Sequence, residues 1–244
     1  MTQSPTAESA TAPAKSLPAR FAGILFAPRA TYANVAAHPR WPGMLLVVFL
    51  ISAAASVALL STEVGRNAVI DQQVASREAF GRPMTQAEIT RVEAFAPYFV
   101  YITPVFQLFG LSAAALVISG AAFAVFNAML GGDATFKQVF AVVCHSGVVL
   151  AALSVFTTPL AYVRGSLSSA TNLAVFLPFL DDSSFLARML GSIDLIFIWW
   201  MISLAIGLGV LYRKRTGPIA ITLLTIYVAI GVIIAAIKTA STGV

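Results

Sequence analysis

Few residues in this chain have side chains that could do chemistry, and these few lie in or beside long apolar stretches. Cys144 and His145 are neighbours within one such stretch. Neighbouring residues on a helix point about 100° apart, so this pair is not aimed at one substrate. Asp194 opens another apolar stretch, where a carboxylate can cap a helix N-terminus. We predict that Asn127, His145 and Asp194 are polar residues with interhelical or functional roles.

Known catalytic patterns are missing from the sequence. It contains no HExxH, GxSxG, Walker or Rossmann pattern. The single cysteine, Cys144, cannot form an intramolecular disulfide. Together with His38 and His145 it provides too few ligands for a closed zinc site. The sequence therefore predicts no catalytic residue, no metal site and no cofactor, and a protein that is not an enzyme.

The composition indicates a protein whose solvent is mostly lipid. Of 244 residues, 59% are hydrophobic and 10% are charged, and the mean hydropathy is +0.87. A soluble domain has about a quarter of its residues charged. The net charge of +5 is scattered between apolar stretches rather than gathered in a stripe. We therefore expect the lipid bilayer as a partner and no nucleic acid.

The charges divide the apolar sequence into transmembrane spans, because a span needs about 20 apolar residues. We predict an all-α polytopic bundle of five transmembrane helices near 42–62, 101–130, 137–161, 193–212 and 217–238. Residues 165–180 are uncharged but include one Gly, three Ser, Thr171, Asn172 and Pro178, so an interfacial loop, a re-entrant loop and a sixth span stay open. The polar stretch between the first two spans predicts an external helical hairpin, with a capping box at Thr85 and Glu88.

The N-terminal region divides into a tail and a patterned segment. Residues 1–16 are small and polar, which predicts a disordered tail. Residues 17–40 alternate apolar runs with arginines between prolines, which predicts short interfacial amphipathic helices whose apolar side chains face the acyl boundary. The alternative is a segment packed under the bundle. Candidate lipid headgroup contacts are Arg20, Arg29, Arg40, Arg213, Lys214 and Arg215. The compact basic cluster at 213–215 favours a cytoplasmic N-terminus.

Small residues recur at four-residue spacing in the predicted spans, which favours close helix packing where water supplies no driving force. The candidate packing residues are Gly120, Ala124, Ala128, Gly132, Gly207 and Gly231. Such surfaces are compatible with a compact bundle and with a homo-oligomer.

Three segments of the sequence carry a family resemblance. They are FAGILFAPRATYANVAAHPRWPG before the first span, GGDATFKQVFAVVCHSG at the turn into the third, and DLIFIWWMISLAIGLGVLYR in the fourth. With these segments the chain resembles the Yip (Ypt-interacting protein) domain family over residues 20–240. The resemblance implies a Yip-like transmembrane domain at 41–240 in a bacterial inner membrane. One departure is the third span, which reads Gly147-Val148-Val149 where a proline is expected and has its proline at Pro159.

Two functions of different class follow. The first is a non-enzymatic membrane organiser or protein-binding platform that contacts other membrane or peripheral proteins. Eukaryotic relatives in the resembled family bind small Rab-type GTPases, whereas the bacterial members have no settled biochemical role. The alternative is a small transporter or channel for ions, lipids or apolar solutes, with Asn127, His145 and Asp194 lining its path.

Overall fold

The structure of the protein is a computed structural model that describes residues 13–181 and 184–242, so most of the predicted tail lies outside it. Within these residues every element is a helix, and the one β-type contact is an isolated bridge between Asn172 and Asp194. The predicted all-α fold is confirmed for this part of the chain. In chain order the helices are α1 (Leu17–Phe26), α2 (Pro28–Ala37), α3 (Pro42–Leu60), α4 (Glu63–Ala79), α5 (Gln86–Phe95), the 3₁₀ turn η1 (Ala96–Tyr98), α6 (Phe99–Phe123), the π-helix η2 (Ala124–Met129), α7 (Phe136–Arg164), the 3₁₀ turn η3 (Leu173–Phe176), α8 (Phe185–Gly191), α9 (Leu195–Leu211) and α10 (Thr216–Thr242).

Four helical segments of the described chain are long and apolar enough to cross a membrane. They are Pro42–Leu60, Gln86–Met129, Phe136–Arg164 and Thr216–Thr242. The apolar helix α9 has 17 residues. At 1.5 Å per residue it is about 25 Å long, which is shorter than the ~30 Å of a bilayer's hydrocarbon.

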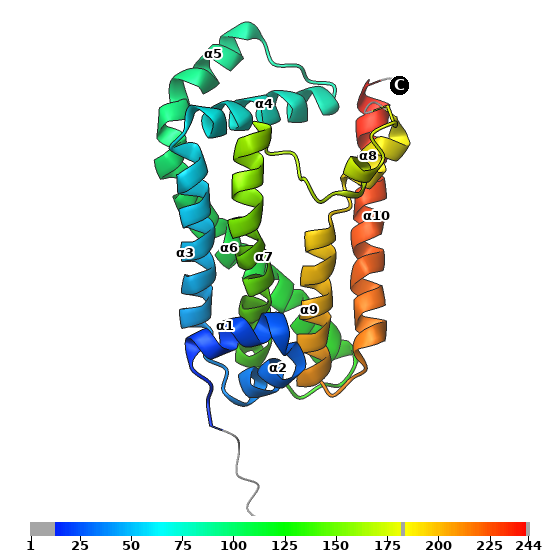
Figure 1. Cartoon of the computed structure of the whole chain (residues 1–244). Helices are drawn as coiled ribbons and strands as arrows, with labels where there is room; N and C mark the ends of the chain where they lie inside the picture. Colours follow the sequence, from blue (N-terminus) through cyan, green and yellow to red (C-terminus); the bar gives the residue numbers. More distant parts are fainter. Residues whose placement is uncertain (1–12, 182–183, 243–244) are drawn as a thin grey trace, which may run out of the picture.

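Helix α7 runs through the middle of the bundle (Figure 1). It packs against α3, α6 and α9, and the short helices α1 and α2 also contact it. Of its most apolar 18 residues, 61% are buried, compared with 28% in α3, 17% in α10 and 11% in the segment that contains α6. The other long helices therefore present most of their apolar side chains to the surroundings, as expected where lipid is the solvent.

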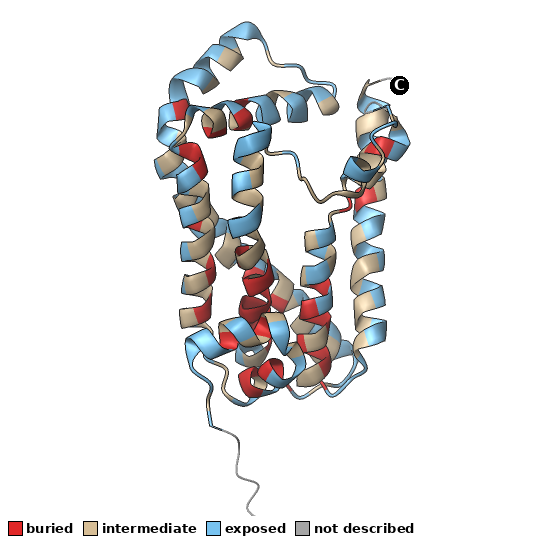
Figure 2. Cartoon of the chain, viewed as in Figure 1, coloured by how far each residue is buried: buried red, intermediate tan, exposed pale blue. Residues whose placement is uncertain are grey.

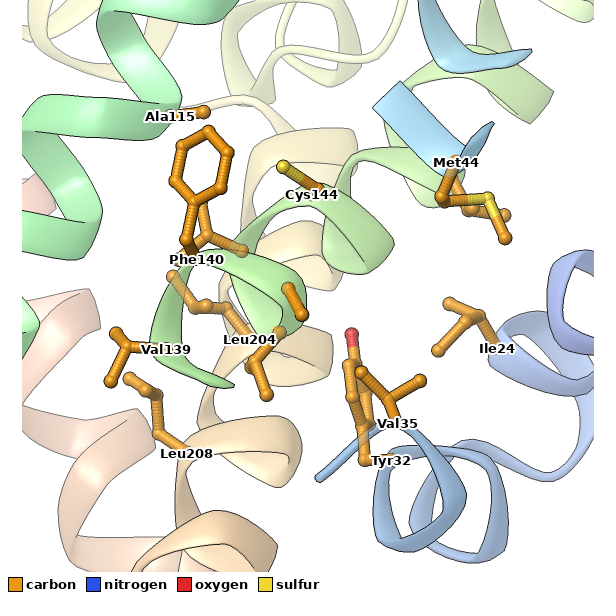
Figure 3. Close-up of a cluster of buried hydrophobic side chains, with 14 of the residues drawn as sticks. Ile24, Tyr32, Val35, Met44, Ala115, Val139, Phe140, Cys144, Leu204 and Leu208 are labelled. Carbon is orange, nitrogen blue, oxygen red and sulfur yellow. The ribbon is translucent and has the colours of Figure 1, made fainter. Parts of the chain in front are cut away.

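The buried core lies near one end of the bundle. Figure 2 shows the buried residues gathered where α1 and α2 meet the lower halves of α7 and α9. The close-up in Figure 3 shows Tyr32 next to Val35, both from α2, in the same cluster as Leu204 of α9 and Phe140 of α7, whose ring points toward Ala115. The N-terminal helices are therefore part of the core rather than additions to it.

At the opposite end, α4 lies across the bundle instead of prolonging α3 (Figure 1). The turn arises at Thr62, whose side chain accepts the Gly65 N–H and begins a new helix there. The far end of α4 packs on the end of α10, where the Lys238 ammonium lies 5.5 Å from the centre of the Phe80 ring. Helix α5 follows with the predicted capping box, which is confirmed.

The two ends differ in charge. We call the end formed by residues 13–40, 131–137 and 212–215 the basic end. In these residues it carries one acidic side chain, Asp133, and the basic side chains Lys15, Arg20, Arg29, Arg40, Lys137, Arg213, Lys214 and Arg215. The opposite end, here the mixed end, comprises residues 61–98, 164–192 and 238–242. Its described charges are Arg66, Arg77, Arg82, Arg91, Arg164, Arg188 and Lys238 with Glu63, Asp71, Glu78, Glu88, Glu93 and Asp181.

Candidate functional site

Prolines set the positions of the first three helices. Pro18, Pro28 and Pro42 each stand in the first turn of a helix, where the missing N–H costs no hydrogen bond. The residue before a proline is pushed out of the helical region, which ends α1 before Pro28. The two short helices that the proline spacing predicts are therefore present as α1 and α2.

The apolar face of these helices points into the protein. Ile24 of α1 and Val35 of α2 are 2% and 0% exposed, and Tyr32 is 0% exposed. The hydroxyl groups of Tyr32 and Ser203 are 2.8 Å apart, so α2 is hydrogen-bonded to α9 within the core. Burial raises the pKa of Tyr32, and the bond to Ser203 opposes that rise. The structure thus has the packed arrangement that stood as the alternative. An apolar helix face predicts burial against apolar groups, but it does not distinguish lipid from protein as the cover.

Arg20 was predicted to contact lipid headgroups, yet it is 3% exposed. Its Nε donates to the Lys15 carbonyl at 3.1 Å and its Nη1 to the His38 carbonyl at 3.1 Å. Burial lowers the pKa of the guanidinium, and the positive charge of Arg40 lowers it further. Arg20 therefore holds the segment before α1 against the segment after α2.

Residues 13–16, the described part of the predicted disordered tail, lie against α2. Asn34 donates from Nδ2 to the Pro13 carbonyl at 3.0 Å and accepts the Lys15 N–H at 3.0 Å. These two bonds fix the backbone before α1, so an ordered segment begins ahead of Leu17.

The other candidate headgroup contacts are exposed side chains. Arg29 lies in the first turn of α2 and Arg40 follows that helix, and Arg213, Lys214 and Arg215 form the turn between α9 and α10. Arg213 has a φ of 52°, the only described residue other than glycine with a positive φ, and this left-handed residue reverses the chain between the two helices. Five cations at the surface of one end give it a positive potential.

Asn127 lies within the π-helix and next to the basic end, where both of its hydrogen-bond partners stand. It donates from Nδ2 to the Ala134 carbonyl at 2.7 Å and accepts from the Tyr212 hydroxyl at 2.6 Å. The Tyr212 ring stacks on Phe126 with 4.5 Å between centres. Asn127 thus connects the end of α6, the 131–135 turn and the end of α9, which is an interhelical role.

His145 lies inside the core on α7, with a side chain that is 0% exposed. Its Nδ1 is 2.7 Å from the Ala141 carbonyl one turn earlier. Because a carbonyl can only accept, Nδ1 is the donor in this bond. The Nε2 atom is buried and has no hydrogen-bond partner among the described residues.

Asp194 caps α9 far from these two residues. One carboxylate oxygen accepts the Ile196 N–H at 2.7 Å and the Thr171 hydroxyl at 3.0 Å, and the other accepts the Ser169 hydroxyl. Its own N–H donates to the Tyr227 hydroxyl at 2.9 Å. Asp194 therefore joins α9, α10 and the 165–181 segment. The three predicted polar residues do not share a site.

The candidate packing glycines fall into two groups. A Cβ at Gly207 would lie 2.6 Å from Val142 Cγ1 and 2.9 Å from the Tyr32 ring, and one at Gly132 would lie 2.7 Å from the Tyr212 ring. A Cβ at Gly231 would meet the Ser192 hydroxyl oxygen at 2.5 Å. Gly120, by contrast, has nothing within 4 Å, and two further members of its stripe, Ala124 and Ala128, are exposed. The π-helix changes the residue spacing there, so the stripe does not continue in one register to Gly132.

The 131–138 turn contains a docking residue that sequence reasoning missed. Thr135 and Gln138 form a capping box at the start of α7. The Gln138 side chain also donates from Nε2 to the Ala36 carbonyl of α2 at 3.0 Å. The Thr-x-x-Gln spacing signals the cap, but nothing in the sequence signals its second partner 102 positions away.

Metal-ligating side chains do not gather in the described part of the chain, where no three His, Cys, Asp or Glu residues could hold one ion.

The chain matches a known protein family. The family model described as Yip1 domain covers residues 22–237, nearly the whole chain. The chain belongs to the Yip1 domain family. It is therefore a protein of a membrane family. No curated protein and no solved structure matches it.

The three segments that carry the likeness to the Yip family mark helix ends in the structure. The first spans the α1–α2 joint, the second forms the Gly132 turn and the Thr135 cap, and the third begins at the Asp194 cap. Each holds residues that determine where the chain turns, and none of them supplies a catalytic arrangement. The basic end, where the first two segments meet, is the candidate functional site.

Proposed function

We propose that this Yip1 domain protein is a non-enzymatic membrane organiser, and that its basic end is a platform for other proteins at the cytoplasmic surface of a bacterial inner membrane. The observation that carries the proposal is the fixed position of α1 and α2. Their buried face is held by Ile24, Tyr32 and Val35, while Phe26 at the joint between them is 86% exposed and Arg29 is exposed beside it. A binding surface on rigid elements avoids the entropy cost of ordering at the moment of binding.

The topology proposed for this platform has five spans: α3, α6 with η2, α7, α9 and α10. The proposed domain is residues 41–240, preceded by the helical segment 17–40 and a tail. Eight basic residues and one described acidic residue at the basic end support a cytoplasmic N-terminus, although seven basic residues at the mixed end make the count nearly even. Helices α4 and α5 then form the proposed external hairpin.

Cysteine labelling in intact cells tests the orientation. The single native cysteine, Cys144, is buried and should stay unlabelled. We expect a membrane-impermeant maleimide to label an Arg77→Cys variant at the mixed end and not an Arg29→Cys variant at the basic end. The reverse pattern would overturn the proposed orientation.

Photocrosslinking tests the platform. A photoreactive amino acid at Phe26 should form adducts with proteins, whereas the same amino acid at Phe80, which is 40% exposed at the mixed end, serves as the matched control. We expect Arg29→Glu to weaken the adducts from position 26 and Arg91→Glu to leave them unchanged. Adducts with lipid alone at position 26 would refute a protein-binding platform.

A transporter is the second candidate, and it has weaker support. Its proposed path needs Asn127, His145 and Asp194 to line one route, but their hydrogen-bond partners lie in three separate places. Asp194 lines a cavity of about 310 Å³ with Thr157 and Ser169, while His145 lines a different one. Flux in liposomes that disappears on Asp194→Asn would favour the transporter over the platform.

A further inference from the structure

We propose that a cavity between α1, α3 and α7 binds a phosphate group that carries or adjoins a hydroxyl, as in the headgroup of the anionic lipid phosphatidylglycerol. This inference rests on the proposed function in one respect, the placement of the basic end at the membrane surface. The cavity has a volume of about 390 Å³, many times the ~10–15 Å³ that one water needs. Its lining includes Lys15, Arg20, Arg40 and His145.

The charge of the cavity calls for an anion. Three of its lining residues, Lys15, Arg20 and Arg40, are cationic, and none of the described residues that line it is acidic. Burial lowers the pKa of the Arg20 guanidinium, and the positive charge of Arg40, which repels it, lowers this pKa further. A bound anion relieves both the burial of the Arg20 charge and this repulsion.

An unpaired donor points to the same kind of ligand. Arg20 uses Nε and Nη1 on backbone carbonyls, and these two bonds fix the plane of its guanidinium. Its Nη2 is buried and has no hydrogen-bond partner among the described residues. A buried donor left unpaired costs about 1–3 kcal/mol, so an acceptor oxygen in the cavity is favoured. Phosphate oxygens suit a guanidinium especially well.

An unpaired acceptor indicates that the ligand must also carry a hydrogen-bond donor. His145 donates from Nδ1 to the Ala141 carbonyl, so in the neutral ring the buried Nε2 is an acceptor, and it has no partner within the described chain. Chloride or a carboxylate would satisfy Arg20 but offers no donor to His145. Water would serve both atoms and leave three cations uncompensated. A phosphate with a hydroxyl satisfies the donor, the acceptor and the charge together.

The test uses the full-length protein in phosphatidylcholine nanodiscs. Phosphatidylglycerol, inorganic phosphate and glycerol phosphate are titrated separately, and the rise in thermal midpoint gives the affinity. A rise with phosphatidylglycerol alone identifies a lipid headgroup as the ligand. A rise with the soluble phosphates at equal concentration identifies a free phosphate. No rise with any of the three would overturn the proposal.

Matched variants connect the binding to this cavity. Lys15 and Arg40 are exposed, so Lys15→Gln with Arg40→Gln should leave the fold intact and weaken phosphate binding by roughly tenfold or more. The control, Arg29→Gln with Lys137→Gln, removes the same charge from exposed positions outside the cavity lining and should change the affinity by less than about twofold. Equal losses in the two variants would mean a general charge effect and would overturn the site.

A headgroup without a hydroxyl tests the role of His145. Phosphatidylmethanol has the same phosphodiester charge as phosphatidylglycerol but lacks the hydroxyl, so we expect it to bind more weakly. His145→Leu should remove this preference, and its midpoint without lipid shows whether the fold survives. Equal binding of both lipids to the native protein would overturn the role given to His145.

The two proposals fail separately. Loss of protein adducts at Phe26 with phosphate binding retained would refute the platform and keep the cavity site. Adducts that persist in the Lys15→Gln, Arg40→Gln variant, with phosphate binding absent from the native protein, would refute the cavity site and keep the platform.

Discussion

The basic end and the mixed end are built differently. At the basic end, α1 and α2 close the core, and hydrogen bonds join α2 to α9 at Tyr32, α2 to α7 at Gln138, and η2 to the end of α9 at Asn127. At the mixed end, α5, which is described in full, has no buried residue, and one exposed ion pair between Arg77 and Glu88 at 3.9 Å joins α4 to α5. Such exposed pairs contribute little to stability.

The two ends of the bundle therefore differ in both charge and packing. Side chains with one sign of charge stand on the end whose backbone is most firmly held. At the mixed end, α5 has a local helix cap and buries none of its residues, so it can open without disturbing the core. If the two ends are independent, a substitution at one end should leave the structure of the other unchanged.

The largest difference is expected from removing a tyrosine at each end. Tyr32→Ala should lower the free energy of unfolding by about 3–5 kcal/mol, because it leaves a cavity in the core and removes the hydrogen-bond partner of the Ser203 hydroxyl. Tyr98→Ala, at a residue that is 56% exposed, should cost less than about 1 kcal/mol. Denaturation in mild detergent, followed by circular dichroism, measures both. Similar losses would mean that the core extends to both ends.

Adding a methyl group should separate the glycines that pack from the one that does not. Gly207→Ala should destabilise the protein by about 1–3 kcal/mol, because Val142 and the Tyr32 ring cannot easily yield. Gly231→Ala should cost less, since the Ser192 hydroxyl can rotate away. Gly120→Ala should be neutral or stabilise by up to about 1 kcal/mol through helix propensity. Thermal midpoints in one detergent rank the three, and a loss at Gly120 would instead indicate a contact with another copy.

Removing the cap of α9 should open the 165–181 segment alone. Asp194→Ala should cost about 1–2 kcal/mol locally, since it removes an N-cap and two hydroxyl contacts. Hydrogen exchange should rise at the Leu173 and Leu195 amides, which pair with the Ile193 and Thr171 carbonyls. The α7 amides near His145 should keep their protection. Faster exchange throughout α7 would show that the two ends are coupled.

The smallest effect is expected from pH, which should act on one of the two capping boxes. Hydrogen bonds from the Thr85 backbone and side chain lower the pKa of Glu88 below its ordinary value of 4.5. The Glu88 box therefore stabilises α5 fully above the unfolded-state pKa, and this contribution is lost as the pH falls through the folded-state pKa. The Thr135 box uses the uncharged Gln138.

Amide exchange at the first turns of α5 and α7 between pH 6 and pH 3, corrected for intrinsic rates, measures this contrast. Protection should fall in α5 and persist in α7. Glu88→Gln should make the α5 box insensitive to pH, and a pH dependence that survives this substitution would contradict the assignment.

Local sequence signals predicted well where the helices begin and end, but they predicted poorly what each helix face packs against. Prolines placed α1, α2 and α3, and the Thr85 capping box placed α5, because these residues act on their own backbone. The sequence did not indicate that α4 would turn away from α3 at Thr62, since the polar residues after α3 fit a continuing helix equally well. The register change in η2 was also missed, because the small-residue spacing assumes an unbroken α-helix.

The sequence by itself determined that this is a helical membrane protein of the Yip family, because apolar runs and short turn motifs act locally and need no tertiary context. Only the tertiary structure decided what the apolar face of residues 17–40 covers, and that Arg20 is buried beside the cavity that His145 lines. Those relations join residues more than a hundred positions apart. The free energy that sets them comes from packing and hydrogen bonding between helices, which no local pattern records.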